Sequence, residues 1–113
     1  MSAEAAVATL RAAGLTVAAA ESLTGGQVCV ALSEAAGSSS VFVGGVVTYT
    51  VETKVRLLGV DAELLARHGP VAPEVAQQMA AAAKRRTGAD VAVATTGVAG
   101  PQPHGGHPPG FAY

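Results

Sequence analysis

The segment from Glu21 to Gln27 (ESLTGGQ) places a carboxylate, two hydroxyls and a glycine pair between a short apolar run and a helical pattern. Thr24 and Gln27 have the spacing of a capping box, in which each side chain satisfies a free backbone N–H at a helix start. Gly25 and Gly26 would also let a phosphate or carboxylate approach those N–H groups at the positive end of the helix. The motif predicts a capped helix, with an anion-binding site as the functional alternative.

A second polar segment, 95–101 (TTGVAGP), follows the apolar run 91–94. Open α/β sheets bind ligands at the carboxyl ends of their strands, so Thr96 and Gly97 are candidates for the wall of a pocket. The same residues are equally typical of a turn held by threonine hydrogen bonds. The pattern alone leaves both interpretations open.

Lys54 is one of two lysines and closely follows a predicted strand that contains Tyr49. Apolar neighbours would lower the pKa of its amine, and a neutral amine can act as a base. Lys54 is equally consistent with a surface residue paired with Glu52 or Glu21.

Metal and cofactor chemistry find little support in the sequence. His104 and His107 have a spacing compatible with a metal site, but the only cysteine, Cys29, is distant and no acidic residue lies in their loop. Neither lysine follows the glycine pattern of a Walker A motif. We therefore expect no metal and no cofactor.

The composition indicates one cytoplasmic domain. Seven Lys and Arg oppose eight Asp and Glu, a net charge of −1, which does not favour nucleic acid as a partner. The longest stretch without these charged residues, 91–113, is interrupted by prolines and glycines, which argues against a membrane helix. Glu4 precedes any apolar run, unlike in a secretory signal.

The apolar periodicity predicts helices that alternate with strands, and hence an α/β domain of three α/β/α layers with a mostly parallel sheet. Ser2, Thr50 and Asp61 are expected to cap the starts of three helices, and Gly14 and Gly59 to end two of them. The expected helices are 3–13, 24–35, 51–58, 62–68 and 73–87, and the expected strands are 17–20, 46–50, 91–94 and a strand-like 111–113.

Several motifs together resemble the CinA C-terminal domain family, in matching order and spacing over essentially the whole chain. They are 20–26 (AESLTGG), 37–39 (GSS), 45–50 (GVVTYT), Lys54, 58–60 (LGV), 68–69 (HG) and 96–101 (TGVAGP). Characterised members of this family of competence/damage-inducible proteins hydrolyse nicotinamide mononucleotide to nicotinate mononucleotide and ammonia. The resemblance implies a cofactor-free amidohydrolase that self-associates, as a dimer.

The resemblance further implies a Ser/Lys mechanism, in which a hydroxyl activated by a desolvated amine forms an acyl-enzyme. Ser39 would be the nucleophile, Lys54 its base and Tyr49 a partner that orients the pair. The resemblance also implies substrate-binding residues. Thr24, Gly25 and Gly26 would contact the phosphate, Thr96 and Gly97 would contact the substrate or the oxyanion, and Glu21 and Ser22 would be further substrate-binding residues.

Three departures from the family pattern bear on activity. Val51 stands where the family has an asparagine, and Ala72 stands where it has a serine. Family domains also continue beyond the equivalent of Tyr113 with another strand and a helix that includes a site arginine, so we expect the domain of residues 1–113 to lack that segment. The alternative function is a catalytically silent nucleotide-binding or regulatory module.

The predicted Ser39–Lys54 pair meets a geometric difficulty. If the helix after Thr24 starts at the carboxyl edge of a parallel sheet, it delivers Ser39 to the opposite edge, ~16 Å from Tyr49 and Lys54. The pair then meets only if the strand before Lys54 is antiparallel, if residues 38–45 fold back, or across a dimer interface.

Overall fold

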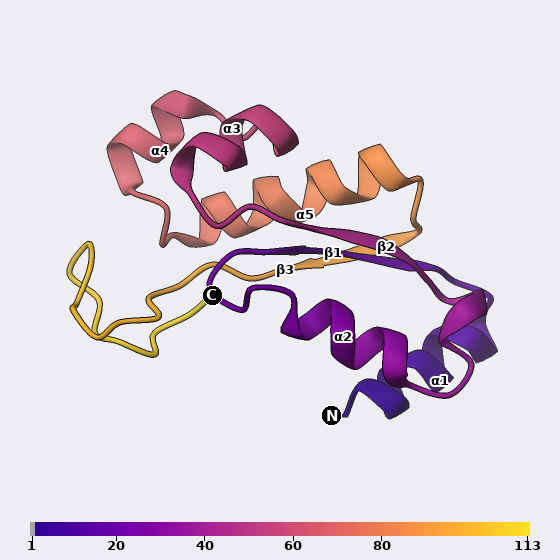
Figure 1. Cartoon of the computed structure of the whole chain (residues 1–113). Coiled ribbons are helices and arrows are strands. Elements are labelled where there is room, and N and C mark those ends of the chain that lie inside the picture. The colour runs from indigo at the N-terminus through magenta and orange to yellow at the C-terminus, as the bar shows by residue number, and fades with distance from the viewer. Residues whose placement is uncertain (1) are drawn as a thin grey trace.

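The structure, a computed structural model, describes residues 2–113 as helices packed on both faces of one small sheet (Figure 1). In chain order the elements are α1 (Ala3–Ala13), β1 (Val17–Glu21), α2 (Gln27–Glu34), the 3-10 helix η1 (Ser38–Ser40), β2 (Phe42–Val47), α3 (Val51–Leu58), α4 (Ala62–His68), α5 (Pro73–Thr87) and β3 (Val91–Ala94). None of the helices in residues 2–113 is long and apolar enough to cross a bilayer.

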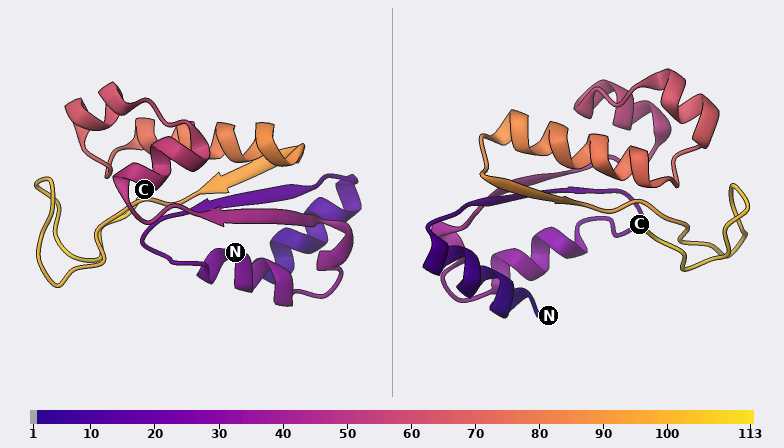
Figure 2. Two further views of the ribbon diagram at one scale, coloured as in Figure 1. Left: turned by 45° about the horizontal axis from the view of Figure 1, so that its top comes forward. Right: turned by 180° about the vertical axis from the view of Figure 1, so that it is seen from behind.

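The sheet has the strand order β2-β1-β3, and both pairings are parallel. Helices α1 and α2 cover one face, while α5 covers the other with α3 and α4 above it (Figure 2). The expected α/β class and three-layer arrangement are confirmed. Parallel strands end at a common edge, so the residues that follow β1, β2 and β3 meet there.

The central strand β1 is buried over all five residues. Its side chains alternate between the two layers: Ala18 and Ala20 join one buried cluster, and Ala19 joins the other. The cluster beneath α5 includes Leu58, Leu65, Val75 and Met79. The small alanines of β1 let helices pack closely on both faces of the strand.

Strand β2 begins at Phe42, four residues before the predicted start, because Gly44 and Gly45 are part of the strand. A Cβ at Gly45 would collide with the Cys29 sulfur and lie 3.0 Å from the Ala19 carbonyl oxygen. Glycine at this position therefore allows α2 to approach the sheet. The pair was expected to lie before the strand because glycine is rare in strands.

The segment 96–113 folds as an extended hairpin rather than ending in a further strand of the sheet. Thr96 and Tyr113 exchange backbone hydrogen bonds of 3.1 and 2.8 Å, and the Val98 N–H donates to the Phe111 carbonyl. The strand-like 111–113 thus pairs antiparallel with 96–98, as an isolated bridge at Gly97 and Ala112.

Helix α2 begins at Gln27, three residues later than predicted, and the expected Thr24–Gln27 capping box does not form. The buried carboxylate of Glu21 caps the helix instead, since it accepts the backbone N–H groups of Gly26, Val28 and Cys29 at 3.0, 3.0 and 2.8 Å. Burial raises the pKa of Glu21, but hydrogen bonds from Cys29, Thr24 and the helix amides outweigh it and lower this pKa to about 2.

Glu21 should therefore stabilise the fold by about 2–3 kcal/mol at neutral pH. Its folded pKa lies below its unfolded value, so this contribution is complete above pH 4.5 and is lost as the pH falls towards 2. We expect Glu21→Gln to lower the free energy of unfolding in urea by that amount at pH 7. At pH 3 the loss should be smaller. The exposed Glu34→Gln on the same helix is the control, and equal urea midpoints for both variants would contradict this role.

Candidate active site

Ser22 and Lys54 form a buried pair at the carboxyl edge of the sheet. The Lys54 Nζ lies 2.7 Å from the Ser22 Oγ and 2.7 Å from the Thr48 carbonyl oxygen, to which it donates. Lys54 is 1% exposed and Ser22 is 5% exposed. A hydroxyl and an amine are thus held in contact where water has little access.

The backbone determines this geometry. Ser22 directly follows β1 and Thr48 directly follows β2, and the Thr48 N–H donates to the Glu21 carbonyl at 2.8 Å. Helix α3 then starts at the capping box of Thr50 and Thr53, which fixes the first turn and turns Lys54 inward. The ends of two strands and one capped helix therefore position both partners.

Burial lowers the pKa of Lys54 to about 8. No carboxylate offsets that effect, because Glu52 pairs with Arg56 at 3.2 Å and Glu21 caps α2. The interpretation of Lys54 as a surface lysine paired with either glutamate is wrong. A substantial fraction of this amine is neutral at mildly alkaline pH, as a general base requires.

The pair lies at the wall of a cleft of about 310 Å³. Five of the predicted site residues line it: Ser22, Tyr49, Lys54, Thr96 and Gly97. Pro70 and Val71 form another part of its wall, and the hairpin contributes residues between Val98 and His104. The cleft is large enough for a small-molecule substrate and places it beside the amine and the hydroxyl.

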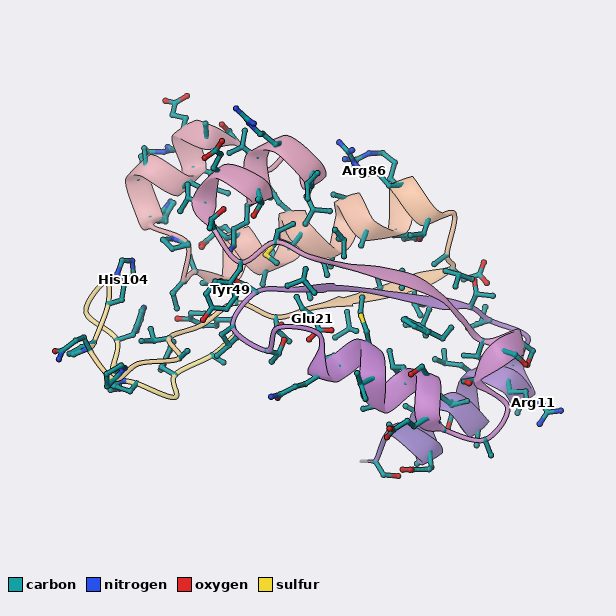
Figure 3. All side chains as sticks on the ribbon, in the orientation of Figure 1. Arg11, Glu21, Tyr49, Arg86 and His104 are labelled. Atoms are coloured by element: carbon teal, nitrogen blue, oxygen red, sulfur yellow. The ribbon has the colours of Figure 1, made fainter. Side chains whose placement is uncertain are left out.

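Tyr49 and Thr96 occupy the cleft in different ways. Tyr49 is 60% exposed and lines the cleft, but the hydrogen bonds of the Lys54 amine go to Ser22 and Thr48 and not to the Tyr49 hydroxyl. Figure 3 shows Tyr49 on the side of the sheet that leads to the hairpin. Thr96 is buried, and its hydroxyl donates to the Pro70 carbonyl at 2.6 Å. Because that proton is already used, the Thr96 oxygen presents only lone pairs to a ligand.

The predicted phosphate site at the start of α2 does not exist in this form. The N–H groups of Gly26, Val28 and Cys29 already donate to Glu21, and those of Gly25 and Gln27 donate to backbone carbonyls. The protein's own carboxylate occupies the position expected for an anion.

Thr24 also lies outside the cleft that contains Ser22 and Lys54. Its hydroxyl contacts that of Thr95 at 2.8 Å, and it borders an apolar groove between α1 and α2. The role predicted for Thr24, Gly25 and Gly26 as contacts to a phosphate is therefore wrong: they shape the turn that follows Ser22. Glu21, also predicted to bind substrate, is buried outside the cleft lining and caps α2 instead.

Ser39 is exposed in η1, at the amino edge of the sheet. Strand β2 is parallel to β1 and separates Ser39 from Lys54 by its length of roughly 16 Å. The predicted Ser39–Lys54 pair therefore does not form within one chain. Ser22, expected only as a binding residue, is the hydroxyl that contacts the amine; its place directly after β1 was the signal that sequence reasoning underused.

Cys29, the one cysteine of the sequence, lies on α2 and faces the sheet. Burial, a hydrogen bond to Glu21 and the negative charge of Glu21 raise the pKa of the Cys29 thiol to about 12. The sulfur therefore remains a thiol, and it packs against Gly45 from a half-buried position.

Known proteins with the same sequence pattern and fold are CinA proteins. The CinA C-terminal domain family matches residues 1–113. A CinA-like protein of Mycolicibacterium gilvum is 56% identical over 79% of this chain, and one of Chloroherpeton thalassium is 50% identical over 81%. This chain spans only about a fifth of the length of these relatives, since the matches cover 21% and 22% of them.

Solved structures agree in fold over nearly the whole chain. A CinA superfamily protein from Escherichia coli has a TM-score of 0.92 at 36% identity, with 97% of this chain and 64% of that chain covered. The competence/damage inducible protein CihA from Agrobacterium tumefaciens has a TM-score of 0.91 at 43% identity, with 97% and 67% covered. By sequence and by structure, this chain belongs to the CinA C-terminal domain family.

Proposed function

We propose that the domain is an amidohydrolase with Ser22 as nucleophile and Lys54 as general base, and that its substrate is nicotinamide mononucleotide. The observation that carries the proposal is the 2.7 Å contact between the Lys54 Nζ and the Ser22 Oγ in a buried site without a competing carboxylate. The resemblance to characterised CinA-type amidohydrolases supports the choice of substrate. Amide hydrolysis also suits the pair, because an amide needs a strong nucleophile.

In the acylation step, neutral Lys54 accepts the Ser22 proton while the Oγ attacks the carboxamide carbon. The tetrahedral intermediate collapses as the Lys54 ammonium returns that proton to the departing nitrogen, and ammonia leaves. Water then attacks the ester, with Lys54 again as base, and releases the nicotinate product and Ser22. The Thr48 carbonyl supports each step, since it accepts one amine N–H and directs the rest of the amine towards Ser22.

Two residues of the 95–101 segment are suited to the carboxamide itself. Thr96 has its proton committed to Pro70, so its oxygen is suited to accept a substrate N–H. In the hairpin, the N–H groups of Thr96 and Val98 donate to carbonyls of the opposite arm. Successive residues of an extended strand point their N–H groups to opposite sides, so the N–H of Gly97 points away from that arm. We assign Gly97 as a donor to the developing oxyanion and Thr96 as an acceptor from the amide nitrogen.

The assignment predicts that the purified protein releases ammonia and nicotinate mononucleotide from nicotinamide mononucleotide, with no added metal and in the presence of EDTA. Coupled ammonia detection and chromatography of the product measure both. Loss of activity with EDTA would contradict the mechanism. Binding of the nucleotide without any ammonia release would instead favour the silent binding module.

A further inference from the structure

We infer that His104 recognises the phosphate group of the mononucleotide substrate and so sets the preference for nucleotides over nucleosides. This inference rests on the proposed function, because it concerns the same cleft. When the carboxamide lies beside Ser22, the phosphate at the other end of the mononucleotide needs a hydrogen-bond donor or a cation elsewhere in the cleft, and phosphate contacts in proteins are commonly charge-assisted.

The lining of the cleft offers few such groups. Of the described residues around it, Lys54 and His104 alone carry a basic side chain. Lys54 is buried and is engaged with Ser22 and the Thr48 carbonyl. Arg11 and Arg86 lie elsewhere on the molecule, away from the hairpin end that carries His104 (Figure 3). Among the residues that line the cleft, His104 is therefore the basic side chain that is available to bind an anion.

The alternative anion site is closed. The N–H groups at the start of α2 donate to Glu21 or to backbone carbonyls, and a phosphate there would have to displace a buried carboxylate of the same charge. A carboxylate in contact with those amides repels a second anion at close range. A phosphate is thus directed away from α2, towards the hairpin side of the cleft.

The hairpin holds His104 at a fixed distance from the reacting end of the cleft. His104 and His107 exchange backbone hydrogen bonds of 3.0 and 2.9 Å. The His107 ring stacks on Phe111 with centroids 4.1 Å apart, and Phe111 meets the Tyr113 ring edge-on at 5.0 Å. Tyr113 in turn is paired with Thr96. A series of direct contacts therefore connects His104 to Thr96, so little ordering is needed when an anion binds.

The side chain of His104 is free to receive a ligand. His104 is exposed, whereas His107 is half-buried because its ring packs on Phe111. His104 thus lines the cleft, whereas His107 packs within the hairpin. An imidazole N–H donates to a phosphate oxygen in either protonation state of the ring, and a nucleoside substrate lacks that acceptor.

The test compares nicotinamide mononucleotide with nicotinamide riboside, which differ only in the phosphate. His104→Ala should lower the ratio of kcat/KM for the nucleotide to that for the riboside by about tenfold, mainly through KM, because a charge-assisted hydrogen bond is lost. His104→Arg should keep a high ratio. The control is His68→Ala, which removes an exposed histidine of α4 outside the cleft and should leave the ratio unchanged.

Binding measured by calorimetry tests the role of His104 independently of catalysis. Wild-type protein should bind nicotinate mononucleotide more tightly than nicotinate riboside, and His104→Ala should reduce that preference by about tenfold. If neither amide is hydrolysed but this binding pattern holds, the proposed reaction fails and the role of His104 stands. An unchanged nucleotide preference in His104→Ala, in hydrolysis or in binding, would overturn the inference.

Discussion

Replacing Ser22 by alanine should lower kcat for nicotinamide mononucleotide by about a thousandfold or more, because the hydroxyl that forms the acyl-enzyme is removed. Lys54→Met should cause a loss of the same order, since it removes the base that contacts that hydroxyl at 2.7 Å. The double variant should be little worse than either single variant, because residues that act as one unit are not additive. Steady-state ammonia release measures all three.

Matched controls exist for both positions. Ser39→Ala and Lys84→Met replace an exposed serine and the second lysine, both away from the cleft, and should retain turnover close to that of the wild type. Circular dichroism and thermal unfolding check that the Lys54 variant is folded. Turnover within a few-fold of wild type for Ser22→Ala would remove this residue from the mechanism.

The rate of hydrolysis should rise with pH through about 8. Lys54 is a base only when neutral, and burial lowers its pKa from 10.5 to about 8. Below that pH the protonated form dominates and kcat/KM should fall by about tenfold per pH unit, whereas above it the rate should level off. With an ordinary lysine pKa, the rise would continue to beyond pH 10.

The measurement is kcat/KM between pH 6 and pH 10, with unfolding followed over the same range. Lys54→Arg is the companion variant, because a guanidinium stays protonated throughout and should be inactive at every pH. A profile that is flat, or that falls between pH 6 and 8, would contradict a neutral lysine base.

The ends of several helices were predictable because their signals are local. Ser2, Thr50 and Asp61 cap α1, α3 and α4, and Gly14 and Gly59 end α1 and α3 at positive φ, as predicted. Each of these effects involves residues within a few positions of the helix end.

The start of α2 was not predictable in the same way. Its capping group, Glu21, lies five to eight residues before the amides that it binds, and the motif at Thr24 and Gln27 offered a plausible local cap. The buried carboxylate prevails because it satisfies three amides at once. Whether Glu21 or Thr24 caps the helix depends on the path of the turn between them and the helix, and the spacing of residues in the sequence does not specify that path.

The reactive pair was only half predictable. The place of Lys54 after a strand left a base and a surface residue equally open, and the family resemblance favoured the base. Its partner lies 32 residues earlier, directly after β1. The parallel β1–β2 pairing, which brings Glu21 opposite Val47, decides that Ser22 rather than Ser39 meets the amine. Strand direction was one of the alternatives that the sequence left open, and it determines which edge of the sheet each serine occupies.

The position of the covalent bond in the acyl-enzyme identifies the nucleophile directly. Protein quenched in acid during turnover of nicotinamide mononucleotide is digested and mapped by mass spectrometry. We expect an ester on Ser22, with a mass increase equal to that of the substrate minus ammonia, and no such species in Ser22→Ala. An adduct on Ser39, or on any peptide without Ser22, would contradict this mechanism.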